Sequence, residues 1–512
     1  MRGVISSGHP VTSEAGASVL RKGGTAVDAA LAASAVSGVT EPGLTSLGGG
    51  GLAVIHEGDS GRNRVFDFFA DMPGLEGDGP DPSSFKELVV DYEGALETYL
   101  VGMGTAALPG VLPGILYIHE EMGTLPLADV LAPAIRVARD GVVLSAFQAR
   151  CNYLFRDLLG MGLESRKVFF RDGVMLKEGE LFTNPNVARL LSKFGSGDWR
   201  QTLENEFYSP IVKHMEEISG PITPADLEHY TPIERCPLEI SCMGFDLLTP
   251  PPPSTGGLRI AFLLKLLERN ELAGMDRTGP EYVELLAQCQ ASTDAMRKGV
   301  VDGNIHDKNL AEEVLSEGCL DRFTDDAMVV APPRSAGNTT QISVTDATGT
   351  AVSLTTTTGE STGFMIPGTG VLYNNMLGEI DLNPDGCRAN PVGKRLTSSM
   401  SPSVMLADGE VIGVMGSGGS SRIISAIVQV SLNHAVFGLD AATSVESPRA
   451  HYEGGVLQME AGFPAATVQK LKRTFEVNEW DRIDRYFGGV HMTTGRTGAG
   501  DTRRSGHFMA VE

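Results

Sequence analysis

The chain has 512 residues, of which 42% are hydrophobic, so it is long enough for two or three domains and can bury a large core. Its 64 acidic and 41 basic residues give a formal net charge of −23, which argues against nucleic acid and anionic membranes as partners. The first residues, MRGVISSGHPVTSEAG, lack an apolar signal region, and no run of about 18 apolar residues follows, so we expect a cytoplasmic protein.

Helix signals open the chain. Ser13 is placed to cap a helix that stops at Gly23-Gly24. Thr25, with Asp28 three residues later, resembles a capping box that leads into a second helix over Ala29–Val39. These two signals predict a helical pair at the amino terminus.

Strand and helix patterns then alternate. Gly48–Gly51 predicts a close-packed bend near a site rather than a nucleotide loop, and an apolar strand follows at Leu52–Ile55. Helical periodicity recurs in three later segments: Leu127–Arg139, Leu258–Glu268 and Ile423–Phe437. The sequence contains no internal repeat of 20 to 50 residues.

The cysteines and histidines indicate no metal or disulfide framework. Six cysteines are widely scattered without a CxxC pair, so free thiols are the expectation: Cys151, Cys236, Cys242, Cys289, Cys319 and Cys387. Cys236 and Cys242 could meet across a turn. The histidines form neither HxH nor HExxH, and we predict no catalytic metal.

A hairpin is predicted between Asn338 and Thr358. Ile342 and Val344 alternate with polar residues, as do Val352 and Leu354, which is the pattern of two half-buried strands around a turn. A two-residue loop would pair Thr339 with Thr358, and a three-residue loop would pair it with Thr357. The run before the hairpin, Ala331–Gly337, is rich in helix breakers, so we expect an exposed, flexible segment that leads to the hairpin.

Threonine at the start of this hairpin has two interpretations. Threonines favour strands in any case. If the amide before Thr339 is cut, however, its free α-amine can take the proton from its own hydroxyl, which makes an N-terminal threonine nucleophile. Such an amine has a pKa of roughly 7.7 to 8.0 and needs no histidine.

Ordered motifs along nearly the whole chain resemble those of the γ-glutamyltransferase family. They are GGTAVDAALAASAVSGVTEPGLTSLGGGG (23–51), ALPGVLPGI (107–115), VLAPAIRVARDG (130–141), TPPPPSTGG (249–257), PGTGVLYNNMLGE (367–379), LTSSMSPSV (396–404), GSGGSSRI (416–423) and GAGDTRRSG (498–506).

The resemblance implies a fold and a maturation step. The expected fold is α/β (α+β), a four-layer αββα sandwich of the N-terminal-nucleophile hydrolase type. The precursor would cut itself between Asn338 and Thr339, with Thr340 as the rival start, and the two fragments, 1–338 and 339–512, would associate as one interleaved domain. No cofactor is implied, and a homo-oligomer remains open.

The resemblance also implies site roles. The N–H groups of Gly419 and Ser420 would form an oxyanion hole, although a glycine-rich turn that opens a helix also explains them. Thr357 would orient the nucleophile. The remaining matches are to substrate-binding positions: Ser398 and Ser399 for an α-carboxylate, and Glu379 for an α-ammonium.

Several positions depart from the family pattern. Phe69 stands where the family has an arginine that pairs with the glutamyl carboxylate, and a phenyl ring cannot replace that charged pair. Met376 and Gly359 replace polar residues, Ser420 replaces a glycine, and Gln341 replaces a histidine. We therefore expect a more apolar pocket with the chemistry retained.

Three functions follow. The first is a self-processing amide hydrolase or acyltransferase that cleaves glutathione-like γ-glutamyl amides or peptides through an ester on Thr339. The second is an acylase for a less charged amide. The third is an unprocessed binding or scaffold protein, which the departures at Gln341, Phe69 and Ser420 make conceivable.

Overall fold

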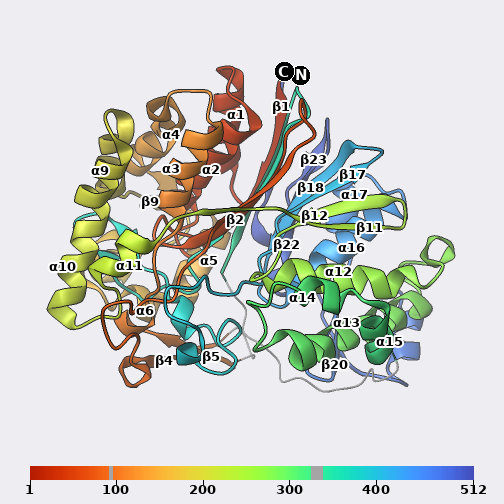
Figure 1. Ribbon diagram of the computed structural model, residues 1–512. Helices are drawn as coiled ribbons and strands as arrows, with labels where there is room; N and C mark the ends of the chain where they lie inside the picture. Colours follow the sequence, from red (N-terminus) through yellow and green to blue (C-terminus); the bar gives the residue numbers. More distant parts are fainter. Residues whose placement is uncertain (92–95, 325–337) are drawn as a thin grey trace.

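The computed structural model describes residues 1–91, 96–324 and 338–512, so the breaker-rich run 331–337 lies outside the described residues. Two sheets form its centre (Figure 1). One has seven strands in the order β10 (Ile233–Arg235), β3 (Asn63–Phe68), β2 (Gly50–His56), β14 (Ala351–Thr357), β13 (Thr340–Asp346), β1 (Gly3–Ser7) and β24 (His507–Val511). The other has six: β11 (Leu238–Cys242), β12 (Phe245–Thr249), β17 (Ser403–Ala407), β18 (Glu410–Gly418), β22 (Gly489–Thr493) and β23 (Gly498–Ala499).

Helices cover the outer face of each sheet (Figure 1). The seven-stranded sheet carries α1 (Pro10–Arg21), α2 (Ala26–Thr40) and α3 (Val111–Met122), and α4 (Leu127–Asp140) packs on α2. The six-stranded sheet carries α12 (Thr255–Glu268) and α16 (Arg422–Ala435), and α13 (Pro280–Met296) packs on α12. The predicted four-layer αββα sandwich is confirmed. No helix in the described ranges is long and apolar enough to cross a membrane.

The predicted helices form, but the start predicted for the first helix is wrong. Thr25 and Asp28 make the predicted capping box at the start of α2. Helix α1, however, begins at Pro10 with His9 as its cap, not at Ser13. Proline favours the first turn of a helix, and the Ser13 hydroxyl is instead hydrogen-bonded to Ser7 Oγ at 2.7 Å and to the His507 carbonyl at 2.8 Å.

The predicted hairpin is β13 and β14, and its register is the three-residue-loop alternative. Thr340 pairs with Thr356 and Thr345 with Ala351, so Thr339 enters the sheet opposite Thr357. The strands are buried on both faces, not half-buried as expected. The polar face is buried because it lies against the second sheet, where each hydroxyl finds a partner; Ser343, for example, donates to the His491 carbonyl at 2.8 Å.

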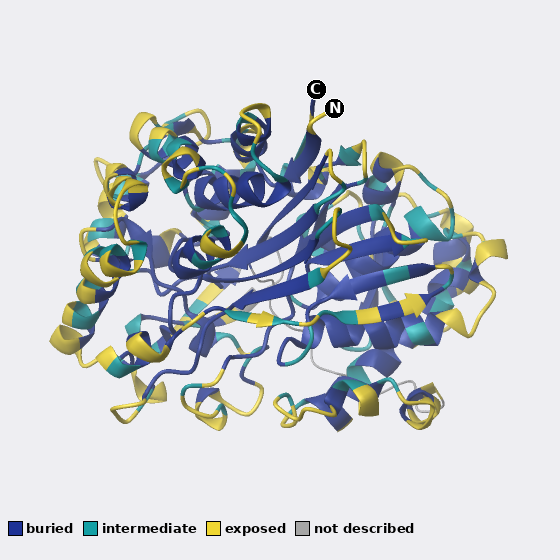
Figure 2. Cartoon of the chain, turned by 45° about the horizontal axis from the view of Figure 1, so that its top comes forward, coloured by how far each residue is buried: buried dark blue, intermediate teal, exposed yellow. Residues whose placement is uncertain are grey.

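The core therefore has two apolar zones and a mixed middle. Most residues on the strands of the two central sheets are buried, as the dark blue in Figure 2 shows. Ile342, Val344 and Leu354 pack with α1 to α4, whereas Met405 and Met415 pack with α12 and α16. Between the sheets, a small apolar cluster that includes Val54 and Val414 lies beside hydrogen-bonded serines and threonines.

Strands from both sides of the predicted cut alternate within one sheet. The neighbours of the hairpin are β2 on one side and β1 on the other, and both come from residues 1–338. Thr339 thus lies at the end of a central strand that is held on both edges. Cleavage before Thr339 would leave these ladders intact.

Candidate active site

The peptide between Asn338 and Thr339 is buried at the amino end of β13. The two residues are 1% and 5% exposed. From the facing strand, Thr357 Oγ1 donates a short hydrogen bond to the Asn338 carbonyl and accepts one from the Gly359 N–H at 3.0 Å. Thr357 was predicted to orient the nucleophile. Its hydroxyl contacts the carbonyl oxygen of Asn338, the residue before the predicted cut.

The predicted oxyanion turn joins β18 to α16. Gly419 has φ +124° and Ser420 φ +51°, so a non-glycine residue occupies the left-handed region. The Ser420 hydroxyl donates to Asp381 Oδ2 at 2.6 Å, which ties the extra side chain down. Within the described part of the chain, no group accepts a hydrogen bond from the N–H of Gly419 or Ser420.

This turn lies directly beside the threonine. A Cβ added to Gly418 would come within 2.5 Å of the Thr339 carbonyl oxygen, so only glycine permits the approach. On the other side, a Cβ on Gly359, whose φ is +61°, would lie 2.5 Å from Glu379 Oε1. The contacts thus bring Thr357, Gly359, Glu379 and the Ser420 turn into one ring around Thr339.

The serines predicted to bind a carboxylate lie in a buried segment. Residues of the motif TPPPPSTGG (249–257) hydrogen-bond to this segment. Ser398 and Ser399 are 3% and 8% exposed. The Ser398 carbonyl accepts from Ser254 Oγ at 3.0 Å and from the Thr255 N–H at 2.9 Å. The Ser398 hydroxyl accepts from the Met400 N–H at 3.1 Å. The hydroxyl is thereby fixed in direction but retains its own proton for a ligand.

Phe69 and Met376, the two apolar departures, meet in one hydrophobic cluster. Both are 1% exposed, and their neighbours include Leu52, Leu396 and Met400. A guanidinium in this region belongs to Arg395, which contacts Asp71 at 3.0 Å and also donates to the Phe69 carbonyl. The Arg395 guanidinium is thus already paired, so it does not replace the arginine missing at position 69.

Gln341, which replaces the family histidine, has a structural role. Its amide nitrogen donates to Ser343 Oγ at 3.0 Å and Ser353 Oγ at 2.9 Å, and its oxygen accepts from Thr355 at 2.5 Å. Every contact of the side chain lies between the sheets. The expectation that this position does not supply the base is consistent with these contacts.

Two charged residues at the site had no role in the sequence analysis. Glu41 Oε2 accepts a 2.6 Å hydrogen bond from Thr340 Oγ1, and complete burial raises the pKa of this carboxyl to about 7. Arg504 Nη1 donates to the Thr339 carbonyl at 3.3 Å. Both occur inside motifs that carry the family resemblance, VTEPG and DTRRSG, but only the fold shows what they touch.

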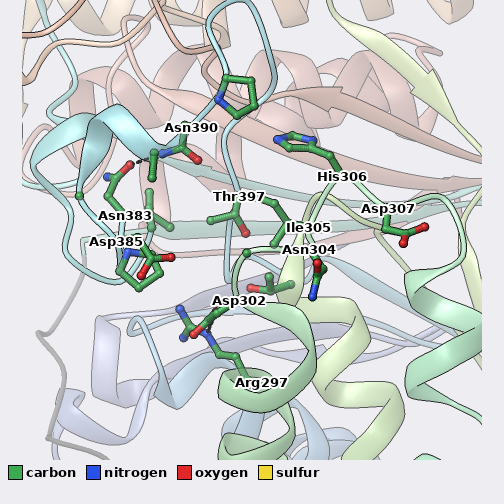
Figure 3. A pocket seen from close by; sticks show the side chains of 17 residues that line it. Arg297, Asp302, Asn304, Ile305, His306, Asp307, Asn383, Asp385, Asn390 and Thr397 are labelled. Atoms are coloured by element: carbon green, nitrogen blue, oxygen red, sulfur yellow. Dashed lines mark hydrogen bonds and ion pairs between the residues drawn. The ribbon is translucent and has the colours of Figure 1, made fainter.

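A cavity of about 320 Å³ adjoins this ring between residues 302–307 and the loop 382–397 (Figure 3). Its wall includes Thr397, next to Ser398, and Arg297, whose Nη2 donates to the Asp381 carbonyl at 2.7 Å. It is large enough for a small polar molecule. Among the described residues, no group of three or more His, Cys, Asp or Glu side chains could hold a metal ion, and all six cysteines, Cys236 and Cys242 included, are free.

The fold and this ring define a class: a four-layer sandwich of the N-terminal-nucleophile hydrolase type, with a threonine at the start of a central strand. A family model described as gamma-glutamyltranspeptidase matches residues 12–511. The chain belongs to the γ-glutamyltranspeptidase family, whose members are enzymes.

Individual relatives carry two kinds of name. The glutathione hydrolase proenzyme of Escherichia coli (strain K12) is 27% identical over 506 residues, which cover 92% of this chain and 85% of the relative. The acylase ACY 1 proenzyme of Pseudomonas sp. (strain SE83) is 30% identical over 486 residues, covering 92% and 86%. A crystal structure of cephalosporin acylase from Bacillus halodurans has the same fold, with a TM-score of 0.84 at 20% identity over 100% of this chain and 96% of that one.

Proposed function

We propose that this chain cuts itself between Asn338 and Thr339 and then works as an amide hydrolase or acyltransferase that carries its acyl group as an ester on Thr339. One observation carries the proposal: the Asn338 carbonyl accepts a hydrogen bond from Thr357, and the Gly418–Ser420 turn abuts Thr339. A hydrogen-bond donor to the carbonyl and a donor turn beside the nucleophile are what acyl transfer requires.

Processing would proceed by an N-to-O acyl shift. Thr339 Oγ1 attacks the Asn338 carbonyl carbon, and the oxygen that gains charge is the one to which Thr357 donates. Collapse breaks the C–N bond and the hydroxyl proton passes to the departing nitrogen, so the Asn338 acyl group is left on Thr339 Oγ1 as an ester and the amine of Thr339 is released. Water then opens the ester. The products are residues 1–338, ending in a carboxylate, and 339–512.

The mature cycle would repeat this chemistry on a substrate amide. The Thr339 amine accepts the hydroxyl proton as the oxygen attacks the substrate carbonyl, and the N–H groups of Gly419 and Ser420 stabilise the oxyanion. The proton passes to the leaving amine. Water, or a second amine, then attacks the ester by the reverse path and regenerates Thr339. The cavity lined by Thr397, the residue before Ser398, offers space for that leaving or incoming amine.

For the acyl group, γ-glutamyl amides such as glutathione are the first candidate, because the family resemblance assigns Ser398, Ser399 and Glu379 to substrate binding and a relative is named glutathione hydrolase. Glu379 also lies beside Gly359 in the ring. The second candidate is an acylase for a less charged group. It is favoured by the apolar cluster of Phe69 and Met376 and by a relative named acylase. A carboxylate would lack the bidentate arginine there.

Two measurements test the proposal. Intact-mass analysis and Edman degradation of the purified protein should find a 174-residue fragment that begins Thr-Thr-Gln-Ile. A chain that stays whole after long incubation would support the scaffold interpretation instead. Turnover of a γ-glutamyl anilide, compared with aliphatic and aromatic acyl anilides, then decides between the two enzymes.

A further inference from the structure

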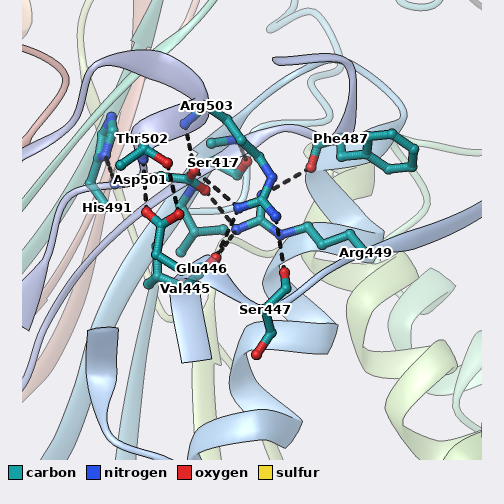
Figure 4. A network of polar contacts seen from close by, with 12 residues as sticks. Ser417, Val445, Glu446, Ser447, Arg449, Phe487, His491, Asp501, Thr502 and Arg503 are labelled. Carbon is teal, nitrogen blue, oxygen red and sulfur yellow. Dashed lines mark hydrogen bonds and ion pairs between the residues drawn. The ribbon is translucent and has the colours of Figure 1, made fainter. Parts of the chain in front are cut away.

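Two adjacent arginines, Arg503 and Arg504, have opposite surroundings. Both lie in the short turn Thr502–Arg504, which Asp501 caps through the Arg503 N–H at 3.0 Å. The Arg503 guanidinium is fully paired: it contacts Glu460 at 2.5 Å. It also contacts Asp501 at 3.2 Å (Figure 4). Asp501 also holds Arg449 at 2.6 Å. This buried ionic network fixes the turn and therefore the position of Arg504.

Arg504 has no such partner. It is 4% exposed, and no carboxylate of the described chain lies within 4 Å of its guanidinium. Within the described ranges the guanidinium makes one hydrogen bond, from Nη1 to the Thr339 carbonyl at 3.3 Å, and its buried Nε has no partner. A buried charge without a counterion is costly, so its retention calls for a reason other than stability.

Three glycines form the slot that holds this side chain. A Cβ would lie 2.4 Å from Arg504 Cδ if added to Gly489, 2.8 Å from Nη1 if added to Gly418, and 3.5 Å from Nη2 if added to Gly419. The positive charge is thus held between the carbonyl of Thr339 and the predicted oxyanion turn.

The other charged and titratable groups that face Arg504 do not cancel its charge. They are Arg485, Cys151, Arg422, Asp501 and Glu41, with His491 nearby. Asp501 is shared between Arg449 and Arg503, and Glu41 has a raised pKa of its own. Burial, followed by repulsion from Arg485, lowers the pKa of Arg504 to about 10, so it remains a cation at neutral pH.

We propose that Arg504 is a positioning residue for Thr339: it fixes the carbonyl of the nucleophile, and its charge keeps the released α-amine of Thr339 unprotonated near neutral pH. The inference rests on the proposed function, because it concerns an amine that exists only after cleavage. Its contact is on the far side of the scissile bond and so survives the cut. A neighbouring cation disfavours the ammonium form, so the amine is free to accept the hydroxyl proton and passes it on readily to the leaving amine.

The wild-type enzyme provides the first test. Edman degradation must first show a fragment beginning at Thr339; without it the proposed function fails, and Arg504 is not at issue. The pKa of that amine is then measured in the folded enzyme from the pH dependence of its acetylation, followed by peptide mass. We expect a value roughly one unit or more below the ordinary 7.7 to 8.0. A value at or above that range overturns the inference.

The second test removes the charge. In Arg504→Met, the acid limb of kcat/KM against pH should move up by about one unit, whereas Arg504→Lys, which keeps the charge, should stay near wild type. Arg473→Met is the matched control, since it removes an exposed positive charge from the same fragment. If the Arg504→Met enzyme is active and the acid limb of its kcat/KM profile lies at the wild-type pH, the inference is contradicted. Should that variant remain uncleaved, the wild-type titration alone decides.

Discussion

The hydroxyl of Thr357 donates its hydrogen bond to the carbonyl of Asn338, nineteen residues earlier in the chain and across one strand pairing. The same oxygen accepts a hydrogen bond from the Gly359 N–H, and this fixes the orientation of the Thr357 hydroxyl proton towards the Asn338 carbonyl. The hairpin register thus does more than bring two threonines together: it aims one of them at the bond that the other would attack.

Removal of this donor should slow self-cleavage. Thr357→Val keeps the shape and burial of the side chain but cannot polarise the Asn338 carbonyl, and one lost donor of this kind costs roughly 100-fold or more in rate. The accumulation of the short fragment over time, followed by gel or intact mass, measures it. Thr357→Ser retains the hydroxyl and is the matched control. Equal cleavage rates for Val and wild type would contradict a role for this hydrogen bond.

The Ser420 turn makes a different prediction, because the site would use its N–H and not its side chain. Ser420→Gly keeps the N–H and suits the φ of +51°, so turnover should stay within a few-fold of wild type despite loss of the contact with Asp381. Ser420→Val places a β-branched residue in a left-handed conformation and should abolish turnover. Steady-state kinetics on the mature variants checks both. A dead glycine variant would mean that the hydroxyl itself is needed.

Phe69 should not accept the arginine that it replaces. Its 1% exposure and its neighbours Leu52 and Met376 leave a guanidinium there buried among apolar groups. Phe69→Arg should therefore lower the free energy of unfolding by about 3 kcal/mol or more, without gaining γ-glutamyl turnover, whereas Phe69→Leu should cost about 1 kcal/mol. Denaturant unfolding and anilide kinetics test this. A stable Phe69→Arg enzyme with improved γ-glutamyl turnover would show that the pocket opens here.

The sequence predicts local features well and distant contacts poorly. Period-two alternation around a turn was enough to predict β13 and β14, and Thr25 with Asp28 to predict the start of α2. The register stayed open because two loop lengths fit the same letters. The contact of Glu41 with Thr340 spans 299 residues and that of Arg504 with Thr339 spans 165, so no spacing rule could have found them. The four-layer fold came from family resemblance.

Glu41 provides a prediction about pH and stability. Burial raises the pKa of its carboxyl from 4.5 to about 7, so the folded protein holds this proton at a pH where the unfolded chain has released it. The contribution of this proton to the free energy of unfolding is complete below pH 4.5. It falls as the pH rises towards 7 and then levels off. The loss amounts to about 3 kcal/mol. Glu41→Gln should remove that part of the slope, since its amide never ionises and still accepts the Thr340 hydrogen bond.

The comparison is best made in the Thr339→Ala background, which we expect to remain one uncut chain, so that unfolding involves no separation of fragments. Denaturant unfolding at pH 4.5, 6 and 8 gives the free energy of unfolding of both proteins. The difference between Glu41→Gln and its parent should shift in favour of the variant by about 3 kcal/mol from pH 4.5 to pH 8. Asp408→Asn, which removes an exposed carboxylate on a turn, is the control and should follow its parent at every pH. Parallel curves for Glu41→Gln and its parent would show that Glu41 is already ionised in the fold.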